Sequence, residues 1–196
     1  MTIIKPSIDA RKIFTHGFAF QRAYETLRDS LLPKDGNLPD AQNVGLLIHP
    51  TLVLSAFASE LYLKTLICIE TGDAPHGHNL LALFEALRVE TRHEIDGLWD
   101  SDIRSPLKKG VLEKLQATEC GKDVRYDLRY ALKKGANGFE VMRYFYENEN
   151  SHFLLADFPY ILRRAILTRH SDWDTILPKP SVNADDVAAH FGKRIE

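Results

Sequence analysis

The sequence predicts an all-α fold, an antiparallel bundle of about five helices. Three observations carry this prediction. Apolar residues recur at steps of three, four and seven in five separate segments, the spacing of one helical face. Short stretches rich in Gly, Pro and Asn separate these segments, and connections this short favour antiparallel neighbours. Alternating strand and helix patterns, which would indicate an α/β fold, are absent from the sequence.

The first two helices are predicted on either side of one loop. Helical spacing covers residues 7–32 and ends at Pro33, and residues 34–43 have the composition of a loop. Pro50 suits the first turn of the second helix, because its missing N–H would have no helical partner there. This second helix is apolar on most sides, so it should lie in the middle of the bundle.

The third helix follows a reversal of the chain. Gly72 and Gly77 should end the second helix and turn the backbone. A one-sided apolar stripe then starts at Leu80, and either Asn79 or His78 is placed to cap its N-terminus.

Prolines position the fourth and fifth helices. Ser105 suits an N-cap and Pro106 suits the first turn of a helix. An apolar face continues from there to Gly121. A further helical stripe covers residues 153–168 and contains Pro159, which would cost about 3 kcal/mol in a helix interior. This helix should therefore start near Asp157.

The remaining segments are less regular. Residues 139–147 fit a short helix or a strand equally well. We expect the bundle to occupy residues 1–170, followed by a C-terminal tail at 171–196 with a short helix near 185–193.

Composition and charge limit the class of protein. The 25 basic and 27 acidic residues give a formal charge of −2, which excludes a global positive field for duplex nucleic acid but allows a local basic patch. The two cysteines, Cys68 and Cys120, are too few for a disulfide framework. Residues 44–69 are the richest apolar stretch, and charged residues and a proline interrupt it. With no signal-peptide pattern either, we expect a cytoplasmic protein without a membrane span.

Two neighbouring segments carry a family resemblance. Residues 59–66 read SELYLKTL and contain an E-x-x-x-K pair, Glu60 and Lys64. After a Gly/Pro turn, residues 76–84 read HGHNLLALF and contain G-H-N-L-x-x-L. Together with the later segment FEVMRYFYE at 139–147, this pattern resembles the HEPN superfamily of small helical proteins associated with nucleotides and RNA.

The resemblance implies an antiparallel helical bundle that often dimerises. In active members it implies a metal-independent endoribonuclease or, with a partner nucleotidyltransferase, a toxin. We therefore expect a homodimer, RNA or nucleotide as ligand, no cofactor, and an antitoxin or defence-system protein as partner. The motif of active members is R-x(4–6)-H near the start of the last long helix. This sequence departs from it, because Arg143 is followed by His152 after eight residues.

Arg143 and His152 are nevertheless the candidate catalytic residues. Cleavage of RNA without a metal needs a proton donor and acceptor, which suits His, and a fixed cation for the charge on the phosphorus centre, which suits Arg. The structural alternative is that Arg143 pairs with Glu140 or Glu147 and that His152 caps the next helix.

Eight further residues are candidates for binding RNA or nucleotide. Lys64 can hold a phosphate, although its spacing from Glu60 also fits an ion pair that orients helices. His78 can contact a ligand or simply hydrogen-bond the helical hairpin. Basic residues interleaved with aromatic ones in the C-terminal half suit an RNA strip, with a solvated face as the alternative. The candidates there are Arg125, Arg129, Tyr144, Arg163, Arg164 and His170.

The sequence does not supply a complete metal site. Asp73, His76 and His78 offer three donors, but no spacing provides the remaining ligand, so we expect no bound metal. Two function hypotheses follow. One is a protein that binds RNA or nucleotide, with metal-independent endoribonuclease activity as an extension. The other is a catalytically inactive module for dimerisation or partner binding.

Overall fold

A computed structural model of the chain describes residues 9–31, 41–106, 108–109, 113, 125–139 and 154–175. In this part of the chain the elements are helices, and no strand occurs, which confirms the all-α prediction. They are α1 (Ala10–Ser30), α2 (Ala41–Thr71), α3 (Leu80–Glu85), α4 (Val89–Ile103), α6 (Leu128–Lys134), α8 (Phe158–Arg169) and the 3₁₀ helix η3 (Ser171–Thr175).

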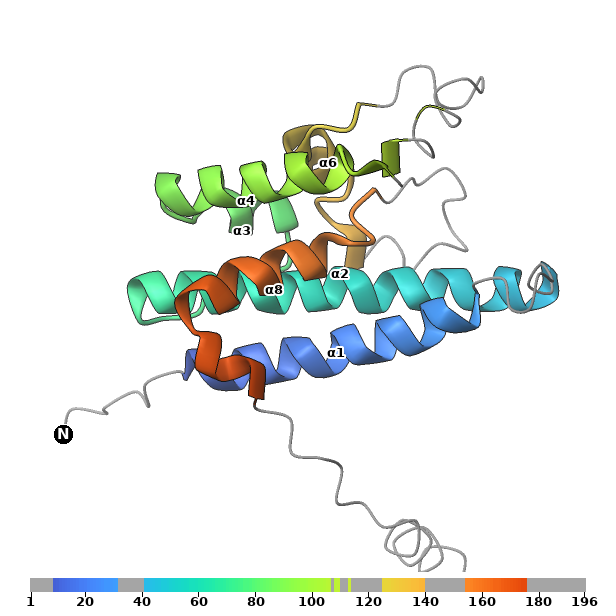
Figure 1. The fold of residues 1–196 in the computed structure, drawn as a ribbon. Coiled ribbons are helices and arrows are strands. Elements are labelled where there is room, and N and C mark those ends of the chain that lie inside the picture. Colours follow the sequence, from blue (N-terminus) through green and yellow to red (C-terminus); the bar gives the residue numbers. More distant parts are fainter. Residues whose placement is uncertain are drawn as a thin grey trace, which may run out of the picture.

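The helices are arranged around α2, as the sequence predicts. Figure 1 shows α1 running antiparallel along one side of α2 and α8 lying along another. α4 packs against α8 and runs opposite to it, while α3 and α6 contact each other. α2 is therefore the axis of an antiparallel bundle.

The largest buried side chains come from every layer of this bundle. Tyr62 of α2, Phe84 of α3, Leu132 of α6 and Phe158 of α8 are each 0% exposed. Trp99 of α4 meets the Phe158 ring edge-on, with the ring centroids 6.0 Å apart. Aromatic pairs of this geometry stabilise a core beyond the apolar area that they bury.

α2 is also long and apolar enough to cross a membrane, over Val44–Thr71 with a mean hydropathy of 1.7. In the structure, 61% of its apolar window is buried inside the bundle. The helix also buries a row of polar side chains, which are Thr51, Ser55, Ser59, Glu60 and Thr65. The central helix of a bundle has these properties without any membrane.

The predicted start of the second helix is wrong. α2 begins at Ala41, so Pro50 lies inside the helix, and residues 41–43, which were predicted as part of a loop, belong to α2. A proline inside a helix leaves the carbonyl four residues earlier without its N–H partner. Here that residue is Leu46, which is 72% exposed, so water can satisfy the carbonyl.

The sequence does not predict α4 or α6. α4 buries only Thr91, Ile95 and Trp99, a single residue per turn, so its apolar stripe is narrower than that of a typical bundle helix. α6 spans only seven residues, too few for a helical period to be recognised in the sequence. The fourth predicted helix, from residue 105 to Gly121, lies mostly outside the described residues.

The predicted starts of α3 and α8 are confirmed. Asn79 is the N-cap of α3, where its Oδ1 accepts a hydrogen bond from the Ala82 amide at 2.9 Å. Asp157 is the N-cap of α8, and Pro159 falls in the first turn. The predicted short helix at 185–193 and nearly all of 139–147 lie outside the described residues. In η3, the Trp173 ring packs against Phe14 in the core.

Candidate functional site

A buried carboxylate links two of the candidate binding residues. Glu60, in the middle of α2, is only 1% exposed. Its Oε1 pairs with the Lys64 Nζ at 2.9 Å. The His78 Nδ1 lies 2.9 Å from Oε1 and 3.0 Å from Oε2 of the same carboxylate. The structure therefore brings Lys64 and His78 together, through a residue that lies 18 positions before His78 in the chain.

Burial differs strongly among the three side chains. Lys64 is 16% exposed and compensates the buried charge of Glu60 at close range, whereas the His78 side chain is 65% exposed. The carboxylate thus holds the imidazole by Nδ1, while most of the His78 side chain is open to solvent. A carboxylate that holds one ring nitrogen fixes both the tautomer and the orientation of an imidazole.

The backbone around His78 is also fixed. Gly77 has a φ of 105°, a conformation that other residues rarely adopt, so the turn directly before His78 requires glycine. After His78, the Leu80 amide donates to the Ala136 carbonyl at 2.7 Å. The Asn79 Nδ2 donates to Asn137 Oδ1 at 3.0 Å, so the turn that follows α6 supports the loop that carries His78.

Aromatic rings lie beside the imidazole. The Phe139 ring is 6.2 Å from the His78 ring and 4.9 Å from that of Phe57, measured between centroids. Phe139 is the residue at which the described segment after α6 ends. His78 therefore combines a fixed imidazole with an apolar ring surface of the kind on which nucleobases stack.

A second group of basic and aromatic residues, which includes the candidates Arg125 and Arg129, lies on α6 and directly before it. Tyr130 is flanked by two cations, with the Arg125 guanidinium carbon 6.0 Å and the Lys134 Nζ 5.8 Å from the ring centroid. Arg125 also pairs with Asp127 at 3.0 Å, and Arg129 lies 3.8 Å from Glu85. We name Arg125, Tyr130 and Lys134 the α6 patch.

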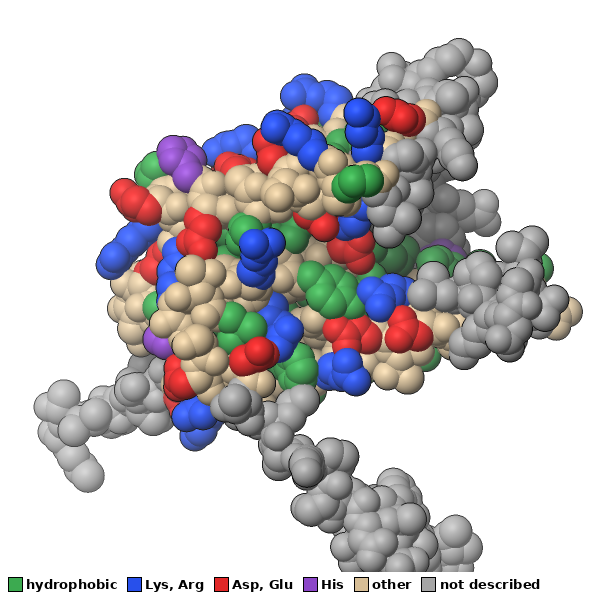
Figure 2. All heavy atoms as spheres, in the orientation of Figure 1, with side chains coloured by type: hydrophobic (Ala, Val, Ile, Leu, Met, Phe, Trp, Pro, Cys, Tyr) green, Lys and Arg blue, Asp and Glu red, His purple; other side chains and the backbone are tan. Residues whose placement is uncertain are grey.

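The remaining described candidates lie on other elements. Arg163 of α8 pairs with Asp174 of η3, Arg164 is exposed, and the His170 ring stacks on Trp173 at 4.2 Å. On the face of the molecule shown in Figure 2, basic and acidic side chains are intermixed. None of the described contacts joins these α8 residues to His78 or to the α6 patch.

The candidate catalytic pair, Arg143 and His152, lies outside the described residues, as does Tyr144. That pair stays a prediction. Within the described ranges, no group of three His, Cys, Asp or Glu residues is arranged to hold a metal ion.

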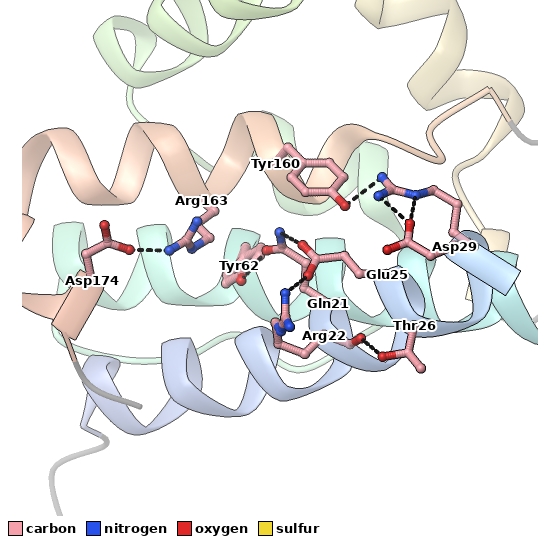
Figure 3. A network of polar contacts seen from close by, with 10 residues as sticks. Gln21, Arg22, Glu25, Thr26, Asp29, Tyr62, Tyr160, Arg163 and Asp174 are labelled. Carbon is pink, nitrogen blue, oxygen red and sulfur yellow. Dashed lines mark hydrogen bonds and ion pairs between the residues drawn. The ribbon is translucent and has the colours of Figure 1, made fainter. Parts of the chain in front are cut away.

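A polar network between α1, α2 and α8 was not predicted. Figure 3 shows it: the Tyr62 hydroxyl donates to Gln21 Oε1 at 2.6 Å, and Gln21 Nε2 donates to Glu25 Oε1 at 2.9 Å. Burial raises the pKa of Tyr62 well above its ordinary value and that of Tyr160 to about 12. Helical periodicity carries no signal for such contacts, because the partners are 41 residues apart in the chain.

Comparison with known proteins adds no assignment, since no protein-family model, curated protein or solved structure matches the chain. The resemblance to the HEPN superfamily therefore rests on the sequence motifs alone. The function has to be argued from the His78 site and its surroundings.

Proposed function

We propose that this helical bundle binds RNA or a nucleotide, with His78 as a phosphate contact. The observation that carries the proposal is the pair formed by the exposed imidazole of His78 and the buried carboxylate of Glu60. A histidine held in this way presents one defined nitrogen to the solvent at little further cost in side-chain entropy.

The chemistry of the surroundings supports a nucleotide rather than a simple anion. A protonated imidazole donates a charge-assisted hydrogen bond to a phosphate oxygen. The neighbouring Phe139 ring can stack with a base, and the α6 patch offers a further ring between two cations. Glu60, which holds His78, is paired with the opposite charge of Lys64, so the buried pair has little net charge.

Endoribonuclease activity would be an extension of the same proposal. An imidazole with one nitrogen free can transfer a proton to or from a reacting oxygen, and this step needs no metal. The activity would further need a cation placed at the phosphate, a role for which Arg143 is the candidate from the sequence.

The test is a fluorescence anisotropy titration of single-stranded RNA with the wild-type chain and two variants. His78→Ala should weaken binding about 10- to 100-fold, the loss expected for one hydrogen bond to a charged group. His76→Ala is the matched control, because His76 is exposed in the same loop. Binding must also weaken with salt. Equal affinities for the His78→Ala and His76→Ala variants would contradict the proposal.

Cleavage is followed on the same RNA with and without EDTA. Cleavage that resists EDTA and is lost in His78→Ala would show metal-independent ribonuclease activity at this site. Retention of RNA without cleavage would assign a binding function only.

A second candidate function is dimerisation through the start of α2. Leu46 is 72% exposed, and its apolar neighbours Val44, Leu47 and Ile48 are only half-buried. An exposed apolar helix end suits contact with a second copy of the chain. Light scattering after size exclusion should give a dimer mass for the wild type and a monomer mass for Leu46→Glu. A monomeric wild type would rule this function out.

A further inference from the structure

We propose that Arg163 is a binding site for a phosphate group, and that the Asp174 carboxylate occupies this site in the present structure. The site is formed by α8 and η3, whereas the function proposed above depends on α2 and the loop before α3. The two proposals therefore depend on different residues and are tested independently.

The Arg163 side chain is held in one position. Its guanidinium carbon lies 4.8 Å from the centroid of the Phe18 ring, within the range of a cation–π contact. Figure 3 shows the side chain extending from α8 toward Tyr62 and Asp174. The Arg163 side chain is 26% exposed, so most of it is already desolvated before any ligand arrives.

Only one of the two nitrogens along one edge of the Arg163 guanidinium group has a partner among the described residues. Nη2 pairs with an oxygen of Asp174, while Nε is buried and has no hydrogen-bond partner among the described residues. Nε and Nη2 form the edge with which arginine binds two oxygens of one carboxylate or phosphate group. A buried donor without a partner is unfavourable, so an anion that satisfies both nitrogens has an advantage over Asp174.

A phosphate group fits this requirement better than the internal carboxylate. It carries more charge and an additional oxygen, and a free phosphate is not constrained by the backbone of η3. Phosphate monoesters and inorganic phosphate share this chemistry.

The present occupant can be displaced without unfolding. The Asp174 side chain is 56% exposed, so solvent screens its side of the ion pair and weakens it. η3 is anchored separately by Trp173, which is 9% exposed and packs against Phe14 with the rings 5.4 Å apart. Displacement of the carboxylate should change the surroundings of Trp173 while the core stays intact.

The two tryptophans allow displacement of the Asp174 carboxylate to be measured. Inorganic phosphate is titrated into the ¹⁵N-labelled protein, and the two indole N–H signals are followed by NMR at constant ionic strength, with sodium chloride as the control salt. The Trp99→Phe variant assigns the signals. We expect the Trp173 signal to shift with phosphate and not with chloride, and the signal of Trp99, which donates to the Tyr126 carbonyl at 2.7 Å, to stay in place.

Three variants decide the interpretation. Asp174→Asn removes the competing charge and should tighten phosphate binding about 1.4- to 5-fold, the factor that corresponds to an exposed ion pair. Asp172→Asn makes the same change of charge on η3 and should have a smaller effect. Arg163→Gln should abolish the phosphate-specific shift.

A Trp173 signal that responds equally to chloride would overturn the proposal, as would equal affinities for Asp174→Asn and Asp172→Asn. The Asp174→Asn comparison decides the question even if Arg163→Gln proves unstable, because Asp174 is largely exposed. Since His78→Ala should leave the phosphate titration unchanged, failure of this site cannot be confused with failure of the RNA site.

Discussion

Replacement of Glu60 by glutamine should destabilise the bundle strongly. The substitution keeps the size of the side chain but removes a charge that is 1% exposed and that contacts both Lys64 and His78. Lys64 would then keep a largely buried ammonium group without its counter-ion. Removal of one partner from a buried ion pair typically costs about 3–5 kcal/mol.

The lower end of that range applies here. The Lys64 side chain is 16% exposed, so water can reach part of it, and the exposed His78 contributes little to stability. We expect a loss of about 3 kcal/mol, which for a chain of this length lowers Tm by roughly 6–12 °C. Thermal and urea unfolding, followed by far-ultraviolet circular dichroism, measure this loss directly.

A double variant separates the charge from the packing. Glu60→Leu combined with Lys64→Leu removes both charges, and its stability should lie within about 1 kcal/mol of the wild type, because paired buried charges gain little over apolar side chains. His78→Ala alone should cost less than about 1 kcal/mol. A Glu60→Gln protein as stable as the wild type would refute the assignment of Glu60 as a buried, charged partner.

The remaining predictions concern the interface of α1 with α2 and α8. Burial raises the pKa of Tyr24, Tyr62 and Tyr160, the last to about 12, so the unfolded chain loses these protons first and stability should fall as the pH rises from 10 to about 12. An ultraviolet titration should show these tyrosines ionising later in the folded than in the urea-unfolded protein; identical curves would contradict their burial. Gly17→Val should lower the free energy of unfolding in urea by about 1–3 kcal/mol, because a Cβ added at position 17 would lie 3.0 Å from Tyr62 Cδ1 and 3.2 Å from Leu61 Cβ. An unchanged midpoint would show that α1 can shift away from α2.

The sequence predicts those parts of the fold that local signals specify. The Asn79 side chain caps α3 and α8 begins directly after Asp157, both as predicted, and the apolar surface of α2 correctly indicates a central helix. Pro50 does not mark the start of α2, because a proline in the first turn and a proline at an exposed position inside a helix look alike in the sequence. The sequence pattern does not predict α4, because this helix buries only one residue per turn.

The candidate site was predictable only in part. The spacing of Glu60 and Lys64 indicates their ion pair, since residues four apart lie on one face of a helix. The contact from Glu60 to His78 depends on how the chain returns after α2, and no local pattern encodes it. For the same reason the sequence does not show that basic residues of the C-terminal half contact different partners, Arg125 the Tyr130 ring and Arg163 the Asp174 carboxylate.

The central claim is that Glu60 fixes His78 for a ligand, and a double-mutant cycle tests it most directly. RNA affinity is measured for the wild type, Glu60→Gln, His78→Ala and the double variant, at a temperature where all four are folded. The account predicts that Glu60→Gln weakens RNA binding when His78 is present and has no further effect in the His78→Ala background. Equal effects of Glu60→Gln in both backgrounds would contradict it.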